Sequence, residues 1–284
     1  MTASLDDQTW DTLIERIREK RCTPFLGAGV STQPLAAEIA QKWATEYGYP
    51  LADSADLARV TQFVAVTLGD SMVPKERLLE LFRNTDAPDF NDLTDPHGLL
   101  ADLPFELYIT TNYDDFLVRA LRNRNRTPQR VVCCWNSSIE GTSPEPPSSA
   151  NPWVFHLHGS DDDPQSIVLT EDDYVDFLVR LRDRDVLPHY IEKALNNTQL
   201  LFMGYSLTDW TFRVLYRGVV LSRPNSQQRT HVAVQLPRED AAAEEYLNKY
   251  FGDMKVRVFW GTAEAFVSEL RRRWEARRDR TGVP

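Results

Sequence analysis

Four short polar clusters follow apolar runs of this sequence, and their residue types suit phosphate binding and proton transfer. The clusters are Gly27–Ser31, Thr111–Asp114, His158–Ser160 and Gly204–Ser206. Each comes directly after a stretch typical of a buried strand, such as "LYIT" or "LLFM". Because the carboxyl ends of parallel strands meet at one edge of a sheet, we expect the four clusters to face one crevice.

The first cluster, Gly27–Ser31, could hold a pyrophosphate. Glycines let the backbone come close to such a group, and the next helix would offer free N–H groups at its N-terminus. The pattern departs from a dehydrogenase fingerprint, because Thr32 stands where a third glycine belongs. A tight strand-to-helix turn is the alternative explanation for these glycines.

His158 is the candidate acid/base group, beside Gly159, since a neutral imidazole can take a proton from a sugar hydroxyl or a water. His156 lies two residues earlier, so the pair would share one face of a strand. A metal site needs further ligands and the sequence supplies no convincing one, so we predict no metal. Asn112 could fix a water or a carbonyl through its amide. Helix capping is the alternative role for Asn112 and Asp114.

The elements that position these clusters alternate along the chain. Buried strands are expected at 22–26, 105–111, 130–135, 153–160, 199–206, 231–236 and 256–261, with amphipathic helices between them. This order predicts an α/β fold, a Rossmann-like, mostly parallel sheet. We expect one domain over 1–284, with a smaller helical module, from 35–95 and 165–198, over the carboxyl edge of the sheet.

Composition narrows the class of protein. A formal charge of −10 argues against broad binding to nucleic acid or to an anionic membrane. The N-terminus is acidic where a signal peptide is basic, no window approaches the ~20 apolar residues of a membrane span, and three cysteines make a poor disulfide framework. We therefore expect a cytoplasmic protein, with the Arg-rich stretch 271–280 as a solvated helix end.

Four motifs together resemble those of the sirtuin (silent information regulator) superfamily: "GAGVS" at 27–31, "TTNYD" at 110–114, "LHGS" at 157–160 and "GYS" at 204–206. In addition, "WGTAEAFVSEL" at 260–270 is similar to the family's last strand and helix. The resemblance implies that Asn112 and His158 are catalytic. It also implies a set of residues that bind the nucleotide: Gly27, Ala28, Gly29, Val30, Ser31, Thr111, Asp114, Gly159, Gly204, Tyr205, Ser206, Asp209 and Gly261.

Two departures narrow this resemblance. Residues 161–203 contain no cysteine, so the four-cysteine zinc module of protein-deacylating sirtuins is absent, and "QPLAAEIAQKWA" replaces the family's Gly-Ile-Pro-Asp-Phe-Arg segment. The chain thus resembles bacterial sirtuin-like effectors of anti-phage defence. That implies hydrolysis of NAD+ to nicotinamide and ADP-ribose in abortive infection, by a homo-oligomer with a separate sensor or HerA-type ring ATPase as partner.

Other functions stay open from the residues alone. A non-catalytic subunit that binds NAD or ADP-ribose would bind tightly without turnover. An NAD-dependent deacylase would transfer an acyl group from a peptide, and the missing zinc module argues against it. A nuclease would need a metal–carboxylate motif, which the sequence does not display.

Overall fold

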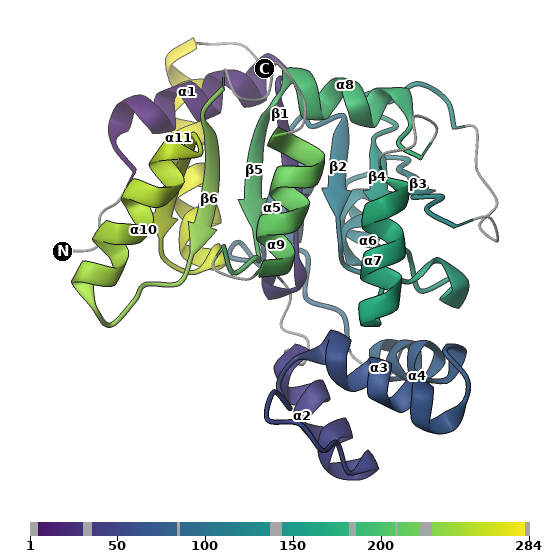
Figure 1. Cartoon of the computed structure of the whole chain (residues 1–284). Coiled ribbons are helices and arrows are strands. Elements are labelled where there is room, and N and C mark those ends of the chain that lie inside the picture. The colour runs from purple at the N-terminus through teal and green to yellow at the C-terminus, as the bar shows by residue number, and fades with distance from the viewer. Residues whose placement is uncertain are drawn as a thin grey trace.

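The computed structural model describes residues 5–30, 36–83, 86–136, 144–181, 186–207, 210–221 and 229–281. Its centre is a seven-stranded sheet in the order β3-β4-β2-β1-β5-β6-β7, and every pairing between these strands is parallel (Figure 1). The strands are β1 (Cys22–Leu26), β2 (Leu107–Thr110), β3 (Gln129–Val132), β4 (Trp153–His156), β5 (Gln199–Met203), β6 (His231–Gln235) and β7 (Val256–Trp260). The predicted Rossmann-like α/β fold is confirmed.

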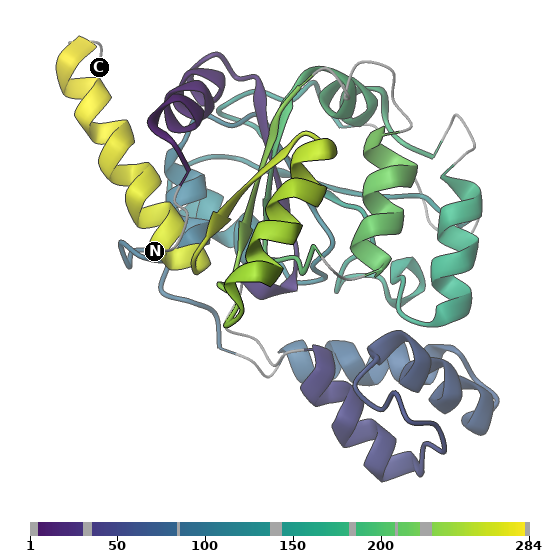
Figure 2. The ribbon, with the colours of Figure 1, turned by 60° about the vertical axis from the view of Figure 1, so that its left-hand side comes forward.

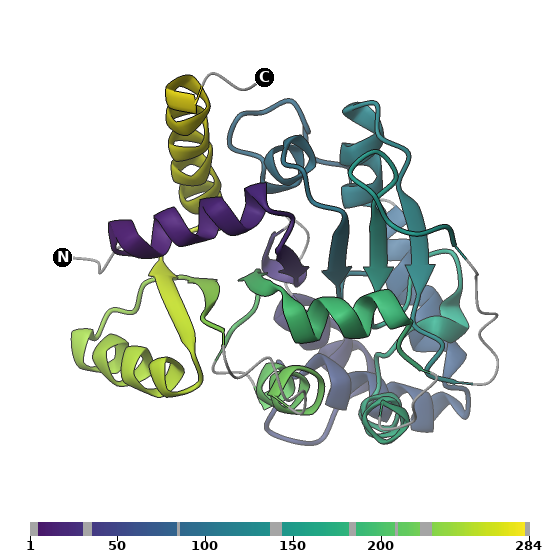
Figure 3. The same ribbon diagram turned by 90° about the horizontal axis from the view of Figure 1, so that it is seen from above.

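Helices cover both faces of the sheet, which explains why β1 and β5 are buried along their whole length (Figure 3). One face packs against α1 (Asp7–Arg18), α5 (Pro96–Asp102), α6 (Phe116–Asn123) and α11 (Ala263–Thr281). The other packs against α7 (Glu171–Arg180), α8 (His189–Asn197), α9 (Trp210–Leu215) and α10 (Ala241–Asp253). The Arg-rich stretch lies on α11, the helix that ends at Thr281.

Helices α2 (Ala36–Tyr47), α3 (Leu57–Leu68) and α4 (Met72–Arg83) lie beyond the carboxyl edge of the sheet (Figures 1 and 2). They share a small core of their own, built around Trp43, Val60 and Leu78, and it closes against Ile167 and Leu169. We call residues 36–83 the helical module. Helices α7 and α8 belong instead to the core of the sheet.

The order of the strands creates a switch point beside β1. The chain runs from β1 to one side of the sheet through β2, and later returns to the other side of β1 through β5. Open α/β sheets bind their ligands in the crevice at such a point. The loops that follow β1, β2 and β5 carry three of the four polar clusters.

The strand expected over 153–160 ends at His156. The chain turns at Gly159, whose φ of +92° is a conformation that residues with a Cβ rarely adopt. His158 therefore lies past the strand and does not share a strand face with His156.

Candidate functional site

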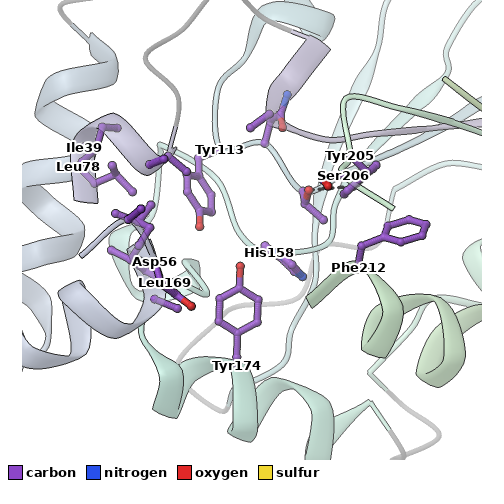
Figure 4. Close-up of a pocket in the computed structure, with 18 of the residues that line it drawn as sticks. Ile39, Asp56, Leu78, Tyr113, His158, Leu169, Tyr174, Tyr205, Ser206 and Phe212 are labelled. Carbon is purple, nitrogen blue, oxygen red and sulfur yellow. Dashed lines mark hydrogen bonds between the residues drawn. The ribbon is translucent and has the colours of Figure 1, made fainter. Parts of the chain in front are cut away.

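A cavity of about 720 Å³ lies between the carboxyl edge of the sheet and the helical module (Figure 4). All four sequence clusters contribute to its wall. The sheet side supplies Ala28, Thr111, Asn112, Tyr113, Asp114, His158, Gly204, Tyr205 and Ser206. Helices α7 and α9 add Tyr174, Phe212 and Leu215, and the module adds Ile39, Ala52–Ala58, Leu78 and Phe82 among others.

Two glycine loops touch each other beneath this cavity. The Gly29 amide donates to the Gly204 carbonyl at 2.9 Å, and Gly27 donates to Met203 at the same distance. Gly204 has a φ of +79°, and a Cβ there would lie 2.4 Å from the Gly27 carbonyl oxygen. The Val30 amide bonds within the first loop, to the Gly27 carbonyl. The close approach that these glycines permit is therefore one between the loop after β1 and the loop after β5. Ala28 lines the cavity, and Ser31 lies outside the described residues.

The Tyr205 hydroxyl ties three strands together. It donates to the Leu26 carbonyl at 2.7 Å and lies 2.8 Å from the Thr111 hydroxyl. Because a phenol has one proton and Leu26 receives it, Thr111 must be the donor in the second bond. Burial raises the pKa of Tyr205, so the phenol keeps this proton at neutral pH.

Asn112 presents an amide oxygen that is buried and has no hydrogen-bond partner in the described part of the chain. Its backbone is held on both sides, by the Thr110 hydroxyl at 2.9 Å and by Nδ1 of His156 at 3.0 Å. Asp114 behaves differently, because its Oδ1 accepts from the amide of Phe116, the first residue of α6, at 3.0 Å. Burial raises the pKa of Asp114. An unsatisfied buried acceptor is costly, so Asn112 is the better candidate for a ligand contact.

His158 lies between the sheet and α7, with its ring packed edge-to-face against two aromatic rings. The ring centroids are 5.4 Å from Tyr174 and 4.9 Å from Phe177. Nε2 of His158 is buried and has no partner among the residues described. Burial lowers the pKa of His158 to about 3, so the imidazole is neutral at pH 7 and one of its ring nitrogens can accept a hydrogen bond.

His156 serves the neighbouring loop. Its Nδ1 lies 3.0 Å from the Asn112 carbonyl, which can only accept, so this nitrogen carries the proton. Burial and the nearby Arg130 lower the pKa of His156 to about 3, and the ring is neutral as well. The two histidines therefore have different positions: His156 donates a hydrogen bond to the loop of Asn112, and His158 lines the cavity.

Two further residues assigned to the nucleotide site do not line the cavity. Gly159 turns the chain, and a Cβ there would lie 2.3 Å from the Ser166 carbonyl. Gly261 follows β7 and donates to the Gln235 carbonyl at 2.8 Å. Asp209 lies outside the described residues. Within the described residues, no three His, Cys, Asp or Glu side chains lie close enough together to hold a metal ion. No helix in this part of the chain is long and apolar enough to cross a membrane.

Tyr113 and Tyr174 line the cavity although the sequence reasoning did not single them out. Figure 4 shows both rings pointing into it from opposite walls, with His158 beside Tyr174. The Tyr113 hydroxyl donates to Val168 at 2.7 Å. Tyr113 belongs to the Thr111–Asp114 cluster, so its place in the sequence could have predicted a position at the cavity. Tyr174 lies on the apolar side of a helix, where its spacing from Phe177 indicates only a core position.

Comparisons with known proteins agree with this architecture. A family model described as a SIR2-like domain matches residues 106–257. The relatives found include proteins named NAD(+) hydrolase ThsA, from Enterococcus faecium (29% identical, 69% of this chain, 39% of that protein) and from Bacillus cereus (24% identical, 91% of this chain, 50% of that protein). The chain therefore spans half or less of the length of these relatives.

A solved structure titled "Structural Basis for the Mechanism and Regulation of Sir2 Enzymes" superposes with a TM-score of 0.46 and 14% identity, over 97% of this chain and all of that one. The family model matches more than half of the sequence, and the expected resemblance is confirmed: the chain belongs to the SIR2-like domain family.

Proposed function

We propose that this chain hydrolyses NAD+ at the bond between nicotinamide and ribose, releasing nicotinamide and ADP-ribose. The observation that carries the proposal is the pair of buried acceptor atoms at one cavity, Oδ1 of Asn112 and Nε2 of His158, which have no partner among the described residues. The names of the relatives, NAD(+) hydrolase ThsA, support the choice of NAD+ as substrate. The cavity of about 720 Å³ has the size of a site for a molecule of this class.

In the proposed reaction, the oxygen of a water forms a bond to C1 of the ribose. The carbon–nitrogen bond breaks and its electron pair leaves with nicotinamide, which becomes neutral. The sugar has oxocarbenium character on the way, as in glycoside hydrolysis generally. Asn112 would accept a hydrogen bond from the water or from a ribose hydroxyl and so orient it. His158 would take the proton of the water and pass it to solvent.

Binding of the nucleotide would fall to the loops around the cavity. We assign this role to Ala28, Thr111, Asp114 and residues 204–206. Gly27 and Gly29 would let the loop after β1 approach the loop after β5. No Lys or Arg lies in the wall of the cavity within the described ranges. The pyrophosphate would therefore be held by uncharged donors of the wall and not by cationic side chains of these residues.

The test is chromatography of NAD+ incubated with the purified chain. Wild type should release nicotinamide and ADP-ribose, and His158→Ala should lower the rate about 10²–10⁴-fold, the range for a general base. Asn112→Ala should lower kcat as well. His189→Ala, at an exposed histidine of α8, is the matched control and should keep the wild-type rate.

Two other outcomes would contradict the proposal. A wild-type rate in His158→Ala would remove the assigned role of that residue. Intact NAD+ after incubation with wild type, together with binding by calorimetry, would replace the hydrolase with a subunit that binds NAD+ without turnover.

We further propose that the chain acts in anti-phage defence by abortive infection, as a cytoplasmic homo-oligomer with a separate sensor or HerA-type ring ATPase. A hydrolase that depletes NAD+ harms its own cell, so its activity must be restrained until infection. Growth of infected cultures, and release of phage from them, with wild type or with His158→Ala tests the role. Co-purification of native complexes tests the partner.

A further inference from the structure

Helix α7 contacts both the helical module and the candidate catalytic histidine. Each of the three acidic residues in its first turn bonds to a different side chain of the module. The pairs are Arg59–Glu171 at 3.3 Å, Gln62–Asp172 at 2.8 Å and Lys75–Asp173 at 2.8 Å. The module is therefore attached to α7 at the edge of the cavity.

The Lys75–Asp173 pair is the buried one of the three. The side chains of Lys75 and Asp173 are 5% and 13% exposed, whereas those of Arg59 and Glu171 are 47% and 44% exposed. The other oxygen of Asp173 accepts from the amides of Leu169 and of Thr170, the N-cap of α7. Exposed ion pairs hold geometry weakly, whereas separating a buried pair is costly because it leaves buried charges unpaired. Lys75 thus fixes the N-terminus of α7 relative to the module.

The next turn of α7 fixes His158. Tyr174 follows Asp173 directly, and Phe177 lies three residues further on, so both rings face the same side of the helix. Both pack edge-to-face against the imidazole of His158. Because Nε2 of His158 has no hydrogen-bond partner in the described ranges, aromatic packing must orient the ring.

We propose that α7 couples the helical module to His158, with Lys75 as a positioning residue at one end and Tyr174 at the other. A displacement of the module pulls on Asp173, moves Tyr174 and changes where the imidazole points. A partner that contacts the module would in this way regulate the site without touching the substrate. The expected effect on rate rests on the proposed hydrolysis of NAD+, but the coupling itself does not.

The state of the imidazole reports this coupling independently of turnover. Its pKa of about 3 is caused by burial, and the rings of Tyr174 and Phe177 are part of what buries it. The titratable groups that share its cavity are Tyr113, Asp114 and Tyr205 from the sheet loops, Tyr174 from α7, and Asp53 and Asp56 from the module. Loss of the α7 contact lets water reach the ring, and the pKa must then rise toward 6.5.

The experiment compares Lys75→Met, Tyr174→Ala and Tyr174→Phe in the full chain. Lys42→Met, at an exposed lysine of the same module, and Val179→Ala, at an exposed position of α7, are the controls. Histidine NMR from pH 4 to 8 follows His158, identified by its absence in His158→Ala. Wild type, both controls and Tyr174→Phe should keep a neutral ring down to pH 5, whereas Lys75→Met and Tyr174→Ala should raise the pKa by one unit or more.

Turnover of NAD+ supplies the second readout. Lys75→Met and Tyr174→Ala should lower kcat about 10-fold to 100-fold, with a smaller change in KM, since a misplaced catalytic group costs rate more than binding. A lower melting temperature in Lys75→Met with an unchanged His158 resonance would overturn the coupling. So would a loss in Tyr174→Phe equal to that in Tyr174→Ala, because the ring is then not what matters. Absence of turnover in wild type would count against the hydrolase alone, since the NMR comparison still stands.

Discussion

The contact between the two glycine loops can be tested by adding one methyl group. In Gly204→Ala the new Cβ would lie 2.4 Å from the Gly27 carbonyl oxygen and 2.6 Å from the Val30 amide nitrogen, at a φ of +79°. The left-handed backbone costs a residue with a Cβ about 1–2 kcal/mol. Forcing extra volume into a packed place costs about 1–3 kcal/mol more, because backbone on both sides must move. We expect a loss of about 2–5 kcal/mol in the free energy of unfolding.

Gly69 provides the matched control. It has nearly the same φ, +68°, but nothing lies within 4 Å of its Cβ position. Gly69→Ala should therefore show the backbone cost alone, about 1–2 kcal/mol. With about 2–4 °C per kcal/mol for a domain near this size, the melting temperature should fall by about 4–20 °C in Gly204→Ala and about 2–8 °C in Gly69→Ala.

Thermal unfolding and urea titration of the two variants measure this difference. Calorimetry with NAD+ adds a functional readout, because only the first variant displaces the loops that line the cavity. A cost in Gly204→Ala no greater than in Gly69→Ala would refute the reasoning, since it would mean that the two loops separate freely.

Burial also predicts how the chain responds to acid and to thiol reagents. His156 and His158 have pKa values of about 3 in the folded state against 6.5 unfolded, so the unfolded chain binds more protons between these values and stability must fall as the pH drops from about 6.5 toward 3. Urea midpoints at pH 7, 5 and 4 should decline, and the decline should be smaller in His158→Gln; equal slopes in both proteins would contradict this origin. Burial raises the pKa of Cys22 and Cys133 more than that of half-buried Cys134. Under native conditions a thiol reagent should modify Cys134 first, as peptide mass mapping would show, and early labelling of Cys22 would contradict the buried strand.

The sequence by itself determined the α/β class and the convergence of the four clusters. Apolar runs such as residues 22–26 and 199–203 mark buried strands, and the polar residues that follow them must meet at one edge once the strands are parallel. Asn112 and His158 were predicted as site residues in this way, because a polar amide and an imidazole directly after a buried strand are not typical core residues.

Only the tertiary structure decided which groups surround those two residues. The glycines at 27 and 204 pack on each other across a gap of 177 positions, and no local pattern reports such a contact. Tyr174 has the spacing of an ordinary core residue, yet it lies against His158 because α7 crosses that corner of the sheet. Gly261 ends a strand like the others, but β7 is two places away from β5 and its loop opens elsewhere. Periodicity indicates which face of an element is buried, whereas the partner it is buried against depends on strand order and packing over the whole chain.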